Sequence, residues 1–257
     1  MCELFGLTGK KNRQLNAELG EFFSHAEENP NGWGLAIFDK GREMLDKEEK
    51  RADRSRRLRK LMSSPVEAAN LIAHIRLATI GYDEFENTHP FTGTDISYRT
   101  WTLAHNGTIF ESGPLSPFFY VQNGFTDSER ILLYIIDRIN RETETKGRAL
   151  DAKERFEVLD GIITRISYKN KLNLLIHDGE ITYVHTNFRD SLYQRVEDGS
   201  VFFSSRPLST GAWEHVPFMR LIGYREDESV FEGTAHDHEY FPDECSLNAL
   251  YLAYSGL

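Results

Sequence analysis

The sequence has little cysteine, no long apolar run and no excess of positive charge. Cys2 and Cys245 are the only cysteines in 257 residues, which excludes a disulfide framework and a paired Cys-x-x-Cys zinc cluster. No run of about 18 apolar residues is present that would span a membrane. The 30 basic residues are outnumbered by 40 acidic ones, giving a net charge of −10. This balance argues against nonspecific binding to nucleic acid or to anionic membranes.

The N-terminus also lacks the features of a secretion signal. Glu3 stands where a signal peptide carries basic residues, and the apolar segment that follows it is too short for a hydrophobic core region. No apolar stretch precedes Cys2, so a lipoprotein signal is excluded as well. We therefore expect a cytoplasmic protein, in which thiols stay reduced and a free Cys2 persists.

The order of the expected elements favours an α+β fold. Strands are expected at 2–9, 33–39, 70–79 and 100–105, and a first helix over about 15–26. Two consecutive helices follow, one from Asp127 and one over 153–168, and further strands are expected at 171–177, 180–186, 200–204 and 216–223. This order fits two sheets with helices outside them.

The length suits a single domain over 1–257, with a core at about 2–210 and a tail from 225 that carries no clear pattern. Segment 47–60 holds many basic residues without interleaved aromatics, so we expect a solvated helix there rather than an anion-binding or partner-binding face.

Cys2 is a candidate nucleophile. If Met1 is removed, one residue carries both a thiol and a free α-amine, which is a nucleophile with its own general base. An α-amine titrates at about pH 7.7–8.0, so a useful fraction accepts a proton at cellular pH. Many chains carry a cysteine at position 2 by chance, so this feature alone does not indicate a function. Its significance depends on internal motifs.

Three internal motifs carry polar residues that suit an amide substrate. Arg76 interrupts an apolar strand, and its guanidinium needs a partner, either a ligand carboxylate or a structural salt bridge. Asn106-Gly107 at a strand end forms either a common turn or an oxyanion hole. Asp127 follows Thr126, the expected N-cap of a long helix, and its carboxylate is available to bind an ammonium group.

The ordered set of motifs resembles the class II glutamine amidotransferase domain, an N-terminal-nucleophile glutaminase, over about residues 2–210. The matching segments are Met1-Cys2, Asn31-Gly32-Trp33-Gly34-Leu35-Ala36, His74-x-Arg76-x-Ala78-Thr79, Asn87-Thr88-His89-Pro90-Phe91, His105-Asn106-Gly107 and Thr126-Asp127-Ser128-Glu129. The resemblance implies a four-layer αββα sandwich of the N-terminal nucleophile hydrolase type. It implies a cysteine amidohydrolase that needs neither a cofactor nor a metal.

The resemblance also implies roles for individual residues. Cys2 would attack the side-chain amide of glutamine while Asn106 and Gly107 hold the oxyanion. Arg76 would bind the α-carboxylate and Asp127 the α-amine. Ammonia would leave, and water would release glutamate from a thioester. The residues implied to shape the pocket are Thr79, His89 and Trp33.

The sequence departs from many family members at Ile80, where they carry a histidine, which favours the stand-alone branch. No phosphoribosyl-transferase, sugar-isomerase or ATP-binding motif is present, so an acceptor for ammonia would lie on a synthase partner. We expect an amidohydrolase acting on glutamine or a γ-glutamyl compound. The alternatives are a γ-glutamyl peptide hydrolase similar to the ergothioneine-pathway enzyme, and a non-catalytic glutamine-sensing or partner-binding module. A bile-salt or penicillin amidase ranks lower, because it would not need Arg76 and Asp127.

Overall fold

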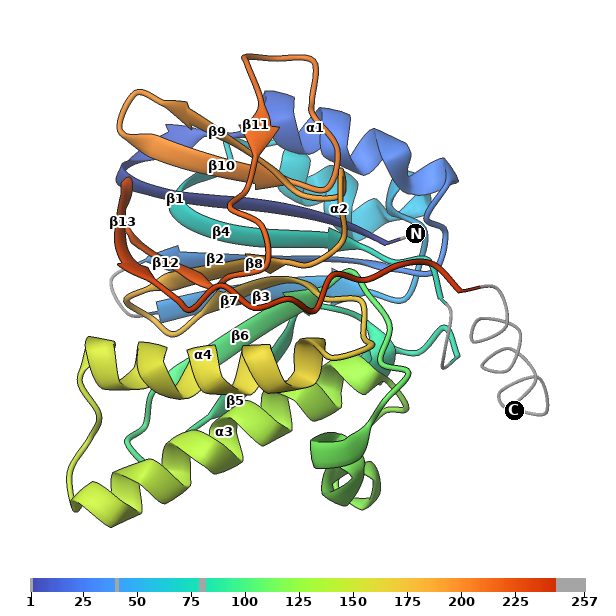
Figure 1. Ribbon diagram of the computed structural model, residues 1–257. Coiled ribbons are helices and arrows are strands. Elements are labelled where there is room, and N and C mark those ends of the chain that lie inside the picture. The colour runs from blue at the N-terminus through green and yellow to red at the C-terminus, as the bar shows by residue number, and fades with distance from the viewer. Residues whose placement is uncertain (1, 40–41, 79–81, 244–257) are drawn as a thin grey trace.

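The computed structural model describes residues 2–39, 42–78 and 82–243. In these residues two antiparallel sheets lie face to face, and helices cover both outer faces (Figure 1). The layers therefore follow the order helix, sheet, sheet, helix. This confirms the expected α+β class and the αββα sandwich.

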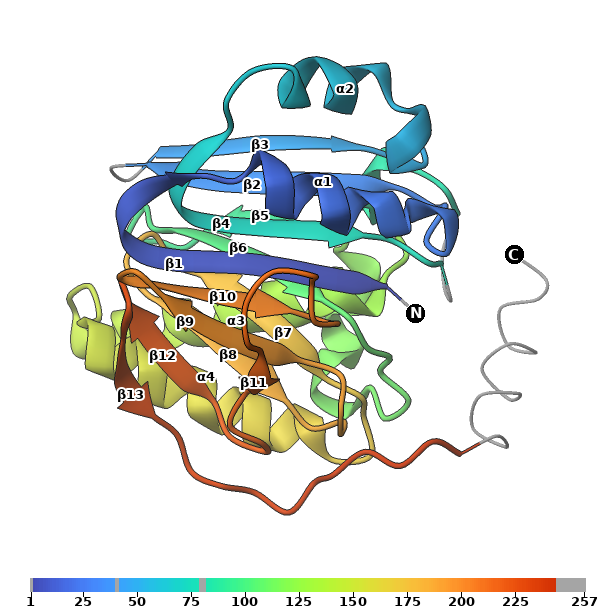
Figure 2. The same cartoon turned by 90° about the horizontal axis from the view of Figure 1, so that it is seen from above.

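Within the described part of the chain, the first sheet has seven strands in the order β11-β9-β10-β1-β4-β2-β3. Their bounds are β1 Glu3–Gln14, β2 Trp33–Asp39, β3 Arg42–Glu48, β4 Glu67–Ile75, β9 Tyr193–Glu197, β10 Ser200–Ser204 and β11 Glu214–His215. The helices α1 (Asn16–Ser24) and α2 (Arg56–Met62) lie on its outer face, with the short 3₁₀ turns η1 (His25–Glu27) and η2 (Ala52–Arg54) (Figure 2). The central strand of this sheet is β1.

The second sheet, counted over the same residues, has six strands in the order β13-β12-β8-β7-β6-β5. Their bounds are β5 Phe91–Thr94, β6 Thr100–His105, β7 Asn173–His177, β8 Thr182–Thr186, β12 Ile222–Arg225 and β13 Glu228–Glu232. The long helices α3 (Asp127–Lys146) and α4 (Ala152–Ser167) cover its outer face (Figure 1). The 3₁₀ turns η3 (Phe85–Asn87) and η4 (Gly113–Tyr120) lie in the connections.

The pleat of β1 decides which of its residues face the second sheet, because successive side chains point to opposite faces. Phe5 packs with the residues of α1, whereas Leu4 packs against Leu175 of the second sheet. Gly6 also faces inward, where a Cβ would lie 2.8 Å from the Leu175 Cδ1 atom. Cys2 has the same phase as Leu4 and therefore lies at the edge of the space between the sheets.

The two long helices begin where the sequence predicts. Thr126 caps α3 by accepting a hydrogen bond from the Glu129 N–H at 3.3 Å. The Glu129 carboxylate instead accepts from the N–H groups of Asn123 and Gly124. In this part of the chain its side chain therefore makes no hydrogen bond back to the Thr126 backbone N–H. The face of α4 that carries Phe156, Leu159, Ile162, Ile163 and Ile166 is buried, as its spacing predicts.

The expectation of one solvated helix over 47–60 is wrong. Strand β3 continues to Glu48, and α2 begins only at Arg56. Lys47 is buried, and its ammonium group donates a hydrogen bond to the Thr88 carbonyl at 2.6 Å. The strand pairing of β3 with β2 overrides the helical propensity of this charged segment.

The late strands also differ from the expectation. Of the segment 216–223, only residues from Ile222 onward form a strand, β12. The residues after 225 continue into β13, which pairs with β12 and completes the second sheet. Part of the tail therefore belongs to the core fold, because β13 protects what would otherwise be an open edge of β12.

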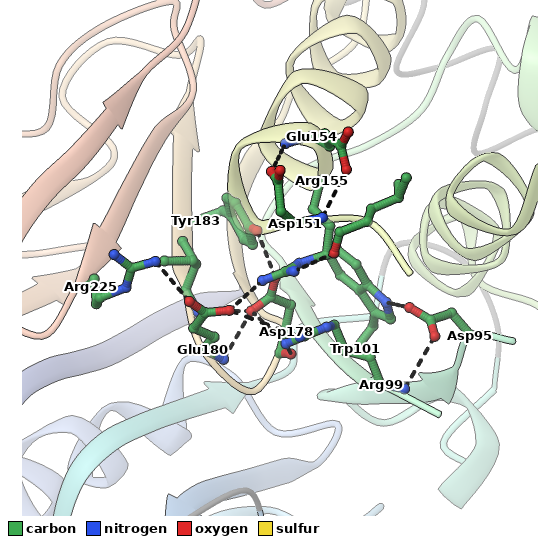
Figure 3. Close-up of polar contacts among 12 residues, drawn as sticks. Asp95, Arg99, Trp101, Asp151, Glu154, Arg155, Asp178, Glu180, Tyr183 and Arg225 are labelled. Atoms are coloured by element: carbon green, nitrogen blue, oxygen red, sulfur yellow. Dashed lines mark hydrogen bonds and ion pairs between the residues drawn. The ribbon is translucent and has the colours of Figure 1, made fainter. Parts of the chain in front are cut away.

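A buried ion network ties α4 to the turn between β7 and β8 (Figure 3). Arg155 donates to the Asp178 carboxylate at 2.6 Å and to the Glu180 carboxylate at 2.7 Å. The Tyr183 hydroxyl donates to the same Asp178 oxygen at 2.7 Å. Burial raises the pKa of the Asp178 carboxyl, but Arg155 and the Ile181 N–H more than offset this, so the pKa lies below its usual value.

We predict that Arg155→Met lowers the free energy of unfolding by about 3–5 kcal/mol, because it removes the nearer cation of a buried carboxylate and leaves Arg99 at 3.8 Å from it. The loss is measured by urea unfolding at pH 7. In the parent, the depressed Asp178 pKa contributes stability that is present above pH ~4 and lost as the pH falls through the folded pKa. Without Arg155 the Asp178 pKa rises. The difference in the free energy of unfolding between variant and parent should therefore become smaller as the pH falls.

The matched control is Lys153→Met, which removes an exposed ion pair to Glu157 on the same helix (3.8 Å). We expect it to cost less than about 1 kcal/mol. This account of the network would be contradicted if the two substitutions lowered the free energy of unfolding equally. It would also be contradicted if the difference between Arg155→Met and the parent did not depend on pH.

Candidate active site

At one end of the space between the sheets, the ends of β1, β4 and β6 meet the first turn of α3. A pocket there is lined by Cys2, Arg76, Leu77, His89, His105, Gly107, Thr108, Thr126, Asp127 and Ser128. Five of the residues singled out in the sequence are therefore brought together: Cys2, Arg76, His89, Gly107 and Asp127. The free volume is about 30 Å³, the space of about one water molecule.

Cys2 places its sulfur against the backbone of the segment that follows β4. The Sγ atom lies 3.3 Å from both the N–H and the carbonyl oxygen of Leu77. Burial raises the pKa of the Cys2 thiol, while the Leu77 N–H and the charges of Arg76 and Lys171 lower it. The thiol thus lies in a packed environment with cations on its periphery, the setting in which thiolate formation depends on local charge.

Arg76 lies just beyond the end of β4 and is 2% exposed. Its backbone N–H donates to the Gly32 carbonyl at 2.8 Å, and the Asn31 N–H donates to the Arg76 carbonyl at 2.9 Å. Its guanidinium donates to the Tyr82 carbonyl at 3.0 Å and lies 3.4 Å from an Asp83 carboxylate oxygen. Arg76 therefore makes a structural ion pair and also lines the pocket, and its binding of a ligand carboxylate stays a prediction.

Asn106 and Gly107 follow β6 and lie beside the pocket. The Asn106 side-chain amide donates to the Ser205 hydroxyl at 3.2 Å, and that hydroxyl also accepts from the Leu4 N–H at 2.9 Å. Ser205 therefore links the Asn106 amide to the strand that carries Cys2. Among the described residues no acceptor is recorded for the Gly107 N–H. This N–H and the second hydrogen of the Asn106 amide are available donors.

Asp127 stands at the start of α3 and is 6% exposed. One carboxylate oxygen accepts from the Ile109 N–H at 2.7 Å, and the other lies 3.3 Å from the Ser128 hydroxyl. Ser128 also lies 3.0 Å from His105 Nδ1, and His105 Nε2 lies 3.1 Å from the carbonyl oxygen of residue 171. Because a carbonyl only accepts, the Nε2 atom carries the proton. Burial lowers the His105 pKa, which favours this neutral form.

His89 forms an uncharged wall of the pocket. Its ring stacks on His74 with centroids 4.1 Å apart, and none of the four ring nitrogens has a partner in the described residues. Burial lowers the pKa of both imidazoles, in His74 to about 3. The turn at His89 is held by Lys47, which donates to the Thr88 carbonyl at 2.6 Å and lies 3.4 Å from that of Pro90.

The prediction that Trp33 shapes the pocket is corrected by the structure. Trp33 pairs with Ile75, so the pleat directs its ring to the outer face of the first sheet, where it packs edge-on to Phe23 with centroids 5.9 Å apart. It is fully buried there and does not line the pocket. Thr79, the other residue implied by the resemblance, lies outside the described residues.

Sequence reasoning assigned no role to Ser128, Ser205 or Lys171. The Ser128 hydroxyl bonds to His105 and the Ser205 hydroxyl to Asn106, and both hydrogen bonds join distant segments. Lys171 follows α4 and pairs with Thr108 through two backbone hydrogen bonds, of 3.0 and 3.1 Å. Its position as the first residue of the predicted 171–177 strand was visible, but its contact with the Asn106-Gly107 loop depends on the fold.

The comparison with protein families shows the family of this chain. The family model of class II glutamine amidotransferases matches residues 1–228. The chain belongs to this family. It is also 31% identical over 190 residues to an uncharacterized protein of Methanocaldococcus jannaschii, which aligns with 74% of this chain. The chain spans only about half of that relative, 52% of its length.

Solved structures show the same amidotransferase fold. A predicted glutamine amidotransferase from Pseudomonas aeruginosa matches with a TM-score of 0.62 at 19% identity, covering 90% of this chain and 100% of that one. Glutamine phosphoribosylpyrophosphate amidotransferase from B. subtilis matches with a TM-score of 0.64 at 16% identity, covering 92% of this chain and 50% of that one. At these identities the likeness shows the fold alone.

Two further observations concern the described residues of this amidotransferase chain. No group of three His, Cys, Asp or Glu side chains there is arranged to hold a metal ion. No helix in this part of the chain has the length and apolar character needed to cross a membrane.

We predict that Gly107→Ala distorts the pocket. An added Cβ would lie 1.9 Å from the Lys171 carbonyl oxygen and 2.2 Å from His105 Nε2, so backbone must move, at a cost of about 1–3 kcal/mol. Thermal unfolding should show a lower melting temperature. The control is Gly113→Ala, where no atom lies within 4 Å of the added carbon. Equal melting temperatures for both variants would contradict the close approach at Gly107.

Proposed function

We propose that this chain, as a single domain over 1–257, is a stand-alone amidohydrolase of the class II glutamine amidotransferase type. Its Cys2 attacks the γ-amide of glutamine or of a γ-glutamyl compound and releases glutamate with ammonia or an amine. The observation that carries the proposal is that Arg76 and Asp127, of opposite charge, line the same pocket as Cys2. A free α-amino acid head presents the complementary pair of charges.

The proposed reaction begins once Met1 has been removed. The Cys2 α-amine takes the thiol proton, and the sulfur forms a bond to the γ-carbonyl carbon. The Asn106 amide and the Gly107 N–H stabilise the oxyanion that develops. The amine returns the proton to the leaving nitrogen as the C–N bond breaks. Water then attacks the thioester, releases glutamate and regenerates the thiol.

Recognition of the substrate head is proposed to depend on two buried groups. The Arg76 guanidinium would bind the α-carboxylate through parallel hydrogen bonds, and the Asp127 carboxylate would accept from the α-ammonium. The bond from the Ile109 N–H holds the Asp127 carboxylate in place before substrate arrives. Ammonia would be used by a synthase partner, while a γ-glutamyl peptide would need no acceptor, and the head contacts suit both substrates.

We predict that Cys2→Ala abolishes hydrolysis of glutamine and of γ-glutamyl compounds. The decisive measurement is the intact mass of the parent before and after diazo-oxo-norleucine, a glutamine-like electrophile. We expect a mass lacking Met1, one adduct that maps to Cys2, and no adduct in the variant. Assays with glutamine and with γ-glutamyl peptides separate the two substrate classes. A parent that keeps Met1 and takes no adduct would point instead to a non-catalytic, glutamine-sensing or partner-binding module.

We predict that Arg76→Gln chiefly raises KM. Loss of a buried, charged hydrogen-bonded partner costs about 2–5 kcal/mol, which corresponds to a rise of roughly 30-fold or more. Steady-state kinetics with the substrate identified by the hydrolysis assays would measure it. Arg141→Gln is the control, since Arg141 is 67% exposed on α3 and pairs only with Asp137 in the described residues. An unchanged KM in the Arg76 variant would remove Arg76 from substrate recognition.

A further inference from the structure

Arg130 is a buried arginine that the proposed reaction does not use. It lies on α3, three residues after Asp127, and is 4% exposed. In the described part of the chain its guanidinium makes one hydrogen bond, in which Nη1 donates to the Gln122 side-chain oxygen at 3.3 Å. The buried Nε–H has no partner there, and none of the described carboxylates forms an ion pair with this arginine. A buried charge without a counter-ion is costly, so the arrangement suits an anion from outside the chain.

The side chain of Arg130 lines a groove with a free volume of about 360 Å³. Small-molecule sites have volumes of roughly 300–1,000 Å³. Three aromatic rings also line the groove, Phe110 from the segment after β6 and Phe119 and Tyr120 from η4. Among the described residues that line it, Arg130 is the only one with a charged side chain. The groove therefore combines one positive charge with aromatic walls.

Contacts outside the groove hold its walls in place. The turn η4, the green coil beside α3 in Figure 1, packs against that helix through Phe118 and Tyr134, whose ring centroids are 5.9 Å apart. Phe110 stacks on Tyr240 with centroids 5.8 Å apart and planes within 6°. Its N–H donates to the Asn170 side chain at 2.7 Å. A groove with fixed walls loses little conformational entropy when a ligand binds.

The groove adjoins the pocket of Cys2 without being part of it. Thr108 lines the pocket, whereas Ile109, the next residue, lines the groove. The Ile109 N–H donates to the Asp127 carboxylate at 2.7 Å, which closes the connection between the two spaces at this point. A ligand in the groove would therefore occupy a site other than that of the proposed amino acid head.

We propose that this groove binds a small molecule in which a carboxylate is attached to an aromatic body. The Arg130 guanidinium would bind the carboxylate through parallel hydrogen bonds. Its carbon atom already lies 5.4 Å from the centroid of the Phe119 ring, so ring and cation present one continuous surface to a flat ligand. A phosphate monoester fits less well, because it carries a charge of about −1.5 to −2 against the single cation of the groove. The proposal does not depend on catalysis by Cys2.

The test is a titration of the protein with 4-fluorophenylacetate, followed by ¹⁹F NMR of the probe. We expect saturable binding to the parent. Arg130→Gln should weaken it at least about tenfold, because a hydrogen bond to a charged group is lost. The uncharged 4-fluorophenylacetamide has nearly the same shape and should bind the parent at least about tenfold more weakly. Arg141→Gln should match the parent, because Arg141 is exposed on the same helix and pairs with Asp137.

A second variant, Arg76→Gln, separates the groove from the pocket of Cys2. We expect it to bind the probe as the parent does. Loss of binding in Arg76→Gln but not in Arg130→Gln would place the probe in the pocket and overturn the proposal. Equal affinities of the parent and Arg130→Gln, equal affinities of the acid and the amide, or no saturable binding would overturn it as well. Tighter binding of 4-fluorophenyl phosphate would overturn the choice of a carboxylate.

The melting temperature of each variant shows whether it is folded. If Arg130→Gln fails to fold, Ser116→Glu takes its place, because Ser116 is an exposed residue that lines the groove. The new carboxylate would pair with Arg130 and repel the probe, so binding should again weaken at least about tenfold. Ser116→Gln is its matched control, with a side chain of the same size and no charge. Equal affinities of the two Ser116 variants would overturn the proposal.

Discussion

The close approach of the two sheets at Gly6 is the constraint on which the pocket depends. Without a side chain at this position, Leu175 reaches the backbone of β1, and a Cβ there would lie only 2.8 Å from it. The contact fixes which face of β1 is turned inward. Two residues before Gly6, Leu4 packs in the same layer. Because side chains two residues apart point to the same face of a strand, Cys2 is turned toward this layer as well. The position of Cys2 is therefore set by core packing rather than by contacts of the thiol.

Packing brings a cost, because a buried thiol resists ionisation and burial raises the Cys2 pKa. The fold offsets this with positive charge near the sulfur, from Arg76, and with histidines that burial keeps neutral. The opposite charge, Asp127, is held by the Ile109 N–H. The electrostatic design thus separates groups that favour a thiolate from the group that suits a substrate ammonium.

Much of this arrangement was predictable from the sequence, because periodicity and caps are local. Helix α4 follows from its apolar spacing, and the start of α3 follows from Thr126. The membership of Cys2, Arg76 and Asp127 in one pocket followed from the order of motifs. Trp33 was misjudged because a motif does not tell which face of a strand its tryptophan occupies. Lys171 was missed because its contact with the loop at Gly107 joins segments 64 residues apart.

The anchoring of β1 supports the proposed role of Cys2 as a reactive chain terminus. Glu3 accepts hydrogen bonds from His25 Nδ1 at 2.8 Å and Asn29 at 3.3 Å, and pairs with Arg206. On the next residue, the Leu4 N–H donates to Ser205 at 2.9 Å. The Glu3 side chain and the Leu4 backbone, immediately after Cys2, are thus held by different segments of the chain. Removal of one preceding residue leaves all these contacts in place, so the new terminus would inherit a defined position instead of fraying as strand ends commonly do.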